Sequence, residues 1–300
     1  MRSSNPVFSR RGFSRDNGSA GFGPQQSQAG GPAVGTTPYP TGNPYAEGTA
    51  NPYGTNPYAT QDTRFGAPQQ VRGDVMTIDD VVSRTAITLG TVVVTAIASW
   101  LLLPVDPANI NKSYGIAIGA ALVAFVLSLV QSFKRRPSPA LILGYAAFEG
   151  VFLGVISAAV STYIADGVVT QAVLGTMAVF AGVLIAYKMR WIRVTRRFYG
   201  FVMAAAMGFV LLMAVNLLFS LFGGGDGLGF RSGGLGIVFG IIGIILGACF
   251  LALDFKQVED GITYGAPREE SWLAAFGLTM TLVWIYLEAL RLLSILQGDD

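Results

Sequence analysis

Seven long apolar runs follow one another from about residue 84 to the end of the chain. Each run approaches the roughly 20 residues that a helix needs to cross a lipid bilayer. The runs cover residues 84–104, 114–133, 139–162, 168–187, 199–222, 235–256 and 272–296. Because the hydrocarbon core offers no water to unpaired backbone groups, these spans should be helices. The sequence therefore predicts an all-α, polytopic membrane protein whose seven-helix transmembrane bundle occupies residues 76–300.

Composition agrees with a lipid environment and excludes several classes of function. Only 13% of the residues are charged and 52% are hydrophobic, whereas a soluble domain averages about 25% charged. The net charge of +2 gives no reason to expect a nucleic-acid partner. The chain contains no histidine, which excludes histidine metal sites and Ser-His-Asp triads. An intramembrane aspartyl protease would need two facing aspartates, and the spans contain only Asp254. We therefore expect no enzyme and no cofactor.

The N-terminal residues 1–75 differ from the rest of the chain. They are rich in Gly, Pro, Ser, Asn, Gln and Thr, and the tripeptide Asn-Pro-Tyr begins at Asn43, Asn51 and Asn56. Such a segment cannot bury enough apolar surface to offset the entropy lost on ordering. The sequence predicts a disordered cytoplasmic tail, either an inert solvated one or a tyrosine-bearing one that binds partners. Thr77 is a candidate N-cap for the first helix, with Asp79 and Asp80 in its first turn.

Basic residues gather in alternate connections between the predicted spans. Ten lie after the second, fourth and sixth spans: Lys134, Arg135, Arg136, Lys188, Arg190, Arg193, Arg196, Arg197, Lys256 and Arg268. The opposite side has three, Lys112, Arg231 and Arg291. Because cytoplasmic loops carry the excess of Lys and Arg, the N-terminus is predicted to be cytoplasmic. Seven spans then put the C-terminus outside.

Pairs of glycines four residues apart recur in the spans. They are Gly115 with Gly119, Gly150 with Gly154, Gly236 with Gly240, and Gly243 with Gly247. Small residues at this spacing let membrane helices approach closely. Tight helix packing is therefore enough to explain nearly all of these pairs.

Charged residues within the spans are the candidates for function, because burying a charge in a bilayer is costly. Glu149 lies near the middle of the third span, Asp254 near the cytoplasmic end of the sixth, and Glu288 and Arg291 in the outer half of the seventh. Glu288 and Arg291 are three residues apart, so they share a helix face and can pair. The pair is either static or part of a pathway. Glu149 has no basic neighbour in sequence and needs a partner from another helix or a neutral state.

Three stretches resemble a known family. They are the basic Lys134–Pro137 entry followed by Leu143–Gly150 (LGYAAFEG), Ala252–Phe255 (ALDF) at the end of the sixth span, and Leu282–Leu296 in the seventh. Together they are similar to the Bax inhibitor-1 family, also called transmembrane BAX inhibitor motif proteins, in a bacterial branch. The resemblance covers roughly residues 80–300. It implies six helices around a hydrophobic seventh, in the cell (plasma) membrane, and a pH-sensitive calcium leak.

The same resemblance implies a pair of aspartates that senses protons and calcium. Asp254 matches the first aspartate, which makes it a weak calcium candidate. An ungapped match of the last span puts Thr281 at the position of the second. Glu288 is the nearest carboxylate on that face, two turns or roughly 10 Å farther out. Calcium prefers about six to eight oxygen ligands, so one carboxylate would give only weak binding.

Two functions remain as alternatives. The first is a passive pathway for calcium or other cations, gated by protonation of carboxylates, with Glu149, Asp254, Glu288 and Arg291 as the residues that line it or sense pH. The second is a non-conducting membrane regulator that binds a membrane protease or another stress-response protein. The lipid bilayer is a partner in both.

Overall fold

The computed structural model describes residues 75–223, 228–230 and 232–298. In these ranges it contains seven helices: α1 (Ile78–Leu102), α2 (Ile110–Phe133), α3 (Pro139–Tyr163), α4 (Val168–Lys188), α5 (Arg196–Gly223), α6 (Gly233–Thr263) and α7 (Glu270–Gly298). All seven are long and apolar enough to cross a membrane. The prediction of an all-α, seven-span membrane protein is confirmed. The tail predicted for residues 1–75 lies, apart from Val75, outside the described residues.

The helix ends follow from local sequence. Thr77 caps α1 as predicted, since its hydroxyl oxygen accepts the Asp80 backbone N–H at 3.2 Å. Helix α6 continues seven residues beyond the predicted limit at Lys256, to Thr263. Lys256 pairs with Asp260 at 2.9 Å, one turn farther along. Ion pairs one turn apart stabilise a helix in water. The apolar pattern stops where the helix leaves the hydrocarbon layer, so it could not show this extension.

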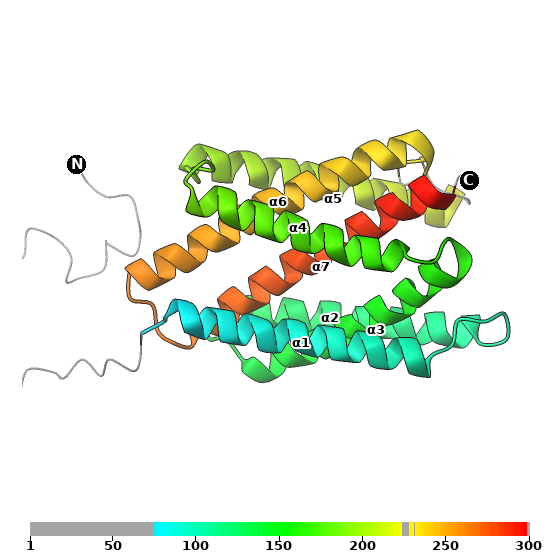
Figure 1. Cartoon of the computed structure of the whole chain (residues 1–300), viewed down its shortest axis with the longest axis horizontal. Helices are drawn as coiled ribbons and strands as arrows, with labels where there is room; N and C mark the ends of the chain where they lie inside the picture. Colours follow the sequence, from blue (N-terminus) through cyan, green and yellow to red (C-terminus); the bar gives the residue numbers. More distant parts are fainter. Residues whose placement is uncertain (1–74, 224–227, 231, 299–300) are drawn as a thin grey trace, which may run out of the picture. The chain divides into compact units, whose positions relative to one another are not determined.

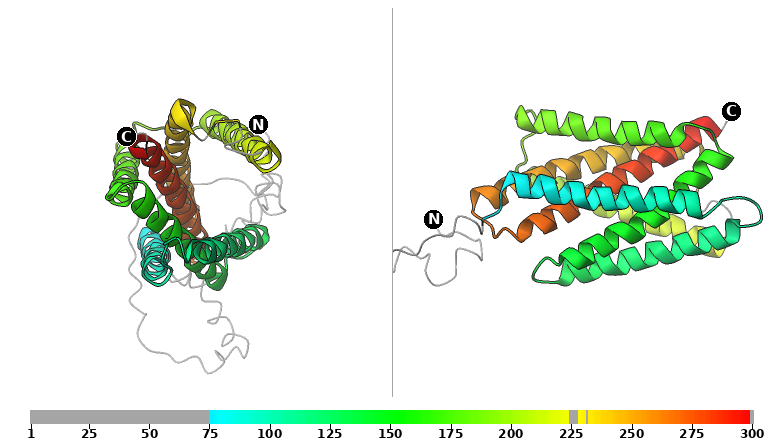
Figure 2. Two further views of the ribbon diagram at one scale, coloured as in Figure 1. Left: turned by 90° about the vertical axis from the view of Figure 1, so that its right-hand side faces the viewer. Right: turned by 60° about the horizontal axis from the view of Figure 1, so that its bottom comes forward.

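Helix α7 is the most enclosed of the seven. Residues buried inside the bundle make up 61% of its most apolar window, against 17% for α1. In Figure 1 it runs between α4 and α1, and the end-on view in Figure 2 shows the other helices arranged about it. Its backbone packs on α1, α3, α4 and α6, and Trp284 reaches Phe209 of α5 with ring centroids 5.7 Å apart. Polar groups on α7 are therefore the ones best shielded from lipid.

Successive helices run in opposite directions (Figure 1). The α2–α3, α4–α5 and α6–α7 connections therefore share one end of the bundle with the start of α1. At this end the backbone N–H of Met76 donates to the Ala266 carbonyl at 2.8 Å, and Asp80 pairs with Arg268 at 2.8 Å. The entry to α1 is thus fixed to the α6–α7 connection.

Two of the four glycine pairs mark the closest helix contacts. A Cβ on Gly150 would lie 1.9 Å from Thr95 Oγ1, and one on Gly154 would lie 2.0 Å from Ser99 Oγ, so α3 presses directly on α1. Gly243 and Gly247 do the same for α6 on α7, where a Cβ on Gly247 would lie 2.5 Å from Ile285.

The other two pairs behave differently. A Cβ on Gly240 would meet Leu292 at 3.3 Å, a tight but less severe contact. Tight packing does not explain Gly115 and Gly119, because a Cβ at either position meets nothing within 4 Å. These two glycines point away from the neighbouring helices.

Candidate functional site

Three helices supply the charged groups that lie within the bundle. Glu149 comes from α3, Asp254 from α6, and Glu288 and Arg291 from α7. Asp254 lies nine residues before the end of α6 at Thr263, or about 14 Å at 1.5 Å per residue. Glu288 lies ten residues before the opposite end of the bundle, where α7 ends at Gly298. The two carboxylates therefore belong to different depths.

Asp254 faces α7 and bonds to Thr281. The Thr281 hydroxyl donates to Asp254 Oδ2 at 2.6 Å. A Cβ on Gly277, one turn before Thr281, would lie 3.5 Å from Asp254 Oδ1. The half-buried carboxylate thus lies over a small residue and beside a hydroxyl. Within the described residues it forms no ion pair.

Thr281 therefore occupies the place beside Asp254 where the family resemblance implies a second carboxylate. Glu288 is seven residues farther along α7, about 10 Å away along the helix axis. Its carboxylate lies against Gly243 of α6, whose Cβ position is 3.0 Å from Glu288 Cδ. The structure brings Thr281 to Asp254 and keeps Glu288 apart from it.

Glu288 and Arg291 form the ion pair that their spacing predicts. Arg291 Nη2 donates to Glu288 Oε2 at 2.5 Å, and the two side chains are only 14% and 10% exposed. Arg291 Nε and Nη1 are buried and have no hydrogen-bond partner within the described part of the chain. One carboxylate thus satisfies only part of the guanidinium, which retains two buried donors.

Glu149 is half-buried on α3, one residue before the contact of Gly150 with α1. It forms no hydrogen bond or ion pair with another residue of the described ranges. Of the two alternatives for Glu149, a partner from another helix or a neutral state, the described residues supply no partner. The roles assigned to Glu149, Asp254, Glu288 and Arg291 stay predictions.

Two polar contacts on α7 were not singled out from the sequence. The hydroxyl groups of Tyr286 and Ser157 lie 2.6 Å apart, which joins α7 to α3. The Trp284 indole N–H donates to the Gly243 carbonyl on α6 at 3.2 Å. The available signal was the residue type, because buried Tyr and Trp usually find a partner for their polar atoms. The sequence could not say which helix supplies it.

Among the described residues, no group of three or more Cys, Asp and Glu side chains lies close enough together to hold a metal ion. Asp254 with Thr281 offers a carboxylate and one hydroxyl at most. Calcium prefers about six to eight oxygens, so this donor set by itself does not provide a tight site.

Comparison with known proteins identifies the family. Residues 5–298 match the family model described as Bax inhibitor 1 like. No curated protein sequence matches the chain.

Proposed function

The chain is a member of the Bax inhibitor-1-like family, and from that membership we propose that it is a pH-sensitive leak pathway for cations, with calcium as the principal ion. The observation that carries this proposal is the contact of Asp254 with Thr281 between α6 and the enclosed helix α7.

The environment of Asp254 suits a group that changes its charge. No Lys or Arg among the described residues pairs with it, and its hydrogen-bond partner is a hydroxyl, which can donate or accept. The ionised carboxylate accepts from Thr281 and attracts a cation into the bundle. The protonated acid is neutral and can itself donate, so the hydrogen bond between α6 and α7 can reverse its direction. Proton binding thereby alters both the local charge and the helix contact.

The other charged groups extend the pathway from Asp254. Glu288 and Arg291 lie toward the opposite end of α7, and the two unsatisfied donors of Arg291 favour water or an anion beside the pair. Glu149 on α3 is the candidate for a residue that the ion passes. Protonating Glu288 would weaken its pair with Arg291 and loosen the outer half of α7.

We place the protein in the cell (plasma) membrane with the N-terminus in the cytoplasm. The basic α2–α3, α4–α5 and α6–α7 connections share one end of the bundle, and cytoplasmic loops are the ones enriched in Lys and Arg. In this orientation Asp254 lies toward the cytoplasm and Glu288 toward the outside.

Calcium flux into liposomes that contain the full chain tests the proposal. A calcium indicator inside the vesicles should report entry that varies between acid and neutral pH, while protein-free vesicles of the same lipid stay silent. An ionophore added at the end shows that the indicator responds at each pH. Absence of flux at every pH would reject conduction and favour the second candidate, a non-conducting regulator that binds another membrane protein.

A further inference from the structure

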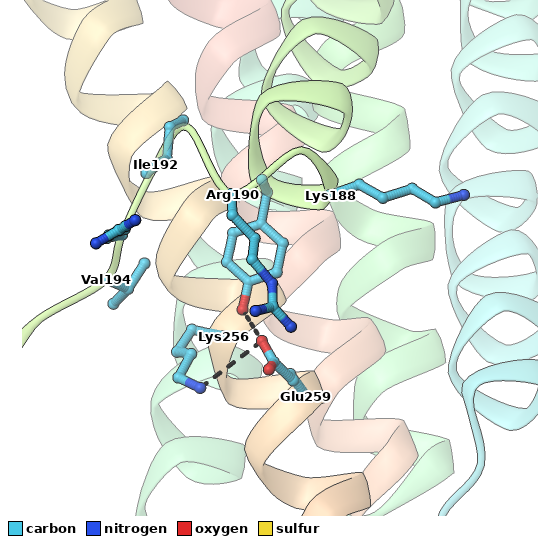
Figure 3. A pocket seen from close by; sticks show the side chains of 8 residues that line it. Lys188, Arg190, Ile192, Val194, Lys256 and Glu259 are labelled. Carbon is cyan, nitrogen blue, oxygen red and sulfur yellow. Dashed lines mark hydrogen bonds and ion pairs between the residues drawn. The ribbon is translucent and has the colours of Figure 1, made fainter.

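A cavity lies at the basic end of the bundle, between the α4–α5 connection and the end of α6. It measures about 620 Å³, and its charged lining consists of Lys188, Arg190, Arg193, Lys256 and Glu259. Figure 3 shows Arg190 above Lys256 and Glu259, while Lys188 extends away from them. The lining holds four basic residues and one acidic residue, and it stays positive even though Asp260 pairs with Lys256.

The single carboxylate of the lining is already engaged. Glu259 accepts a hydrogen bond from the Tyr187 hydroxyl and lies 3.7 Å from Lys256 Nζ, which also pairs with Asp260 at 2.9 Å. Within the described residues, Arg190 and Arg193 form no ion pair. Their guanidinium groups remain available to an anion, and guanidinium matches the geometry of phosphate oxygens.

Arg190 has a backbone conformation that favours glycine. Its φ angle is +60°. Its N–H donates to the Tyr187 carbonyl and the next N–H, of Trp191, donates to the Ala186 carbonyl, both at 2.9 Å. This is the Schellman pattern that ends a helix, in which the left-handed residue is usually glycine. An arginine here is strained, and such strain is found most often where the side chain has a function.

Helix α5 adds positive potential beside the cavity. Thr195 caps it, with its hydroxyl oxygen accepting the Phe198 N–H at 3.2 Å. Arg196 and Arg197 then occupy the first turn, at the positive end of the helix dipole, where basic residues are unfavourable. A bound anion would offset this concentration of positive charge.

Exposed aromatic side chains lie near the cavity. Trp191 is 73% exposed directly beside the lining residue Arg190, and Phe201 in the second turn of α5 is 70% exposed. Exposed Trp is typical of the boundary between lipid and water. Ile185 near the end of α4 and Met189 just after it are each 55% exposed, so apolar side chains are available to an acyl chain whose headgroup enters the cavity.

We propose that this cavity binds the phosphate headgroup of an anionic phospholipid in the leaflet at the basic end of the bundle, with Arg190 and Arg193 donating to the phosphate oxygens. Basic pockets on the cytoplasmic side of membrane helices suit such headgroups. The exposed apolar surface beside the cavity favours a lipid over a soluble phosphate.

Native mass spectrometry of the full chain in detergent tests the proposal. Phosphatidylglycerol and phosphatidylcholine are titrated separately, and bound lipids are counted. The wild type should bind one phosphatidylglycerol about tenfold more tightly than phosphatidylcholine, which corresponds to roughly one or two effective basic contacts. The double variant Arg190→Gln/Arg193→Gln should lose this preference.

Two further variants separate the site from general charge and from folding. Lys134→Gln/Arg135→Gln removes the same charge from the exposed α2–α3 connection at the same end of the bundle and should keep the preference. Arg190→Gly should keep or raise the melting temperature, because glycine adopts a positive φ freely, and should still weaken phosphatidylglycerol binding. Three results would overturn the proposal: equal binding of both lipids by the wild type, an equal loss in the α2–α3 variant, or inorganic phosphate that displaces phosphatidylglycerol at comparable concentration.

Discussion

Thr281 determines how many protons the proposed pathway can bind beside Asp254. Its hydroxyl bonds to Asp254 across the α6–α7 interface, where two carboxylates would repel each other unless they shared a proton. A single carboxylate with a hydroxyl neighbour can ionise without that repulsion. The protein should therefore respond to one protonation at this point rather than to a coupled pair.

Replacing Thr281 with valine tests this contact. Thr281→Val keeps the shape and removes the donor, which leaves Asp254 without its partner. Loss of a hydrogen bond to a charged group costs about 1.5–3 kcal/mol. Thr279→Val is the control, since that hydroxyl bonds to the Ala275 carbonyl of its own helix. The melting temperature in detergent at neutral pH should fall clearly more for Thr281→Val than for Thr279→Val. Equal falls would show that the contact with Asp254 adds no stability beyond that of an ordinary hydroxyl.

The pair of Glu288 with Arg291 makes a second prediction at this scale. Glu288→Gln leaves the buried guanidinium without a counter-charge. Breaking a buried pair in this way costs about 3–5 kcal/mol, less where the arginine reaches toward the membrane surface. The double variant Glu288→Gln/Arg291→Met should be more stable than Glu288→Gln alone, as thermal unfolding would measure. A double variant less stable than the single one would mean that Arg291 has stabilising contacts other than Glu288.

At the scale of helices, packing depends on where small residues face. The α1–α3 contact leaves no space for a Cβ at Gly150, whose position is 2.4 Å from the Val92 carbonyl oxygen as well as 1.9 Å from Thr95 Oγ1. Gly115 has the same spacing to its partner glycine and faces open space. The two pairs look alike in sequence and differ only in their neighbours.

Alanine substitutions distinguish the two kinds of glycine. Gly150→Ala must push α1 and α3 apart, and overpacking of this kind costs about 1–3 kcal/mol. Gly115→Ala should be neutral or slightly stabilising, because alanine favours a helix more than glycine does. Size-exclusion profiles after stepwise heating would compare them. A Gly150→Ala variant as stable as the wild type would contradict the close contact of α1 with α3.

Much of the fold could be predicted from the sequence, because seven apolar runs bounded by breakers leave few alternatives in a bilayer. The ends were harder, as the extension of α6 to Thr263 shows, since polar residues continue a helix once it leaves the lipid. The local pairing of Glu288 with Arg291 follows from their spacing. The bond of Asp254 to Thr281 joins two different helices. Only the family resemblance linked these two positions in the sequence, and the length of the bond depends on how α6 packs against α7.

At the scale of the whole molecule, the seven helices and their alternating directions make a prediction about topology. A reporter fused after Asp300 should be outside the cytoplasm, and one inserted after Arg136 should be inside. The physical reason is the excess of Lys and Arg at the end of the bundle that holds the α2–α3 connection. Paired reporters, one active only in the cytoplasm and one only outside, measure it. Cytoplasmic activity at the C-terminus would contradict a seventh span that crosses the membrane.

We propose that protonation of Asp254 controls a cation pathway, and the pH dependence of calcium flux through Asp254→Asn tests this most directly. Asparagine keeps the shape and imitates the neutral acid. Asp260→Asn, six residues farther along α6 and paired with Lys256 at its exposed end, is the matched control. Flux through Asp254→Asn should lose part of its pH dependence at normal expression, while Asp260→Asn should follow the wild-type curve. If the Asp254→Asn curve instead coincides with that of the wild type, Asp254 is not the sensor.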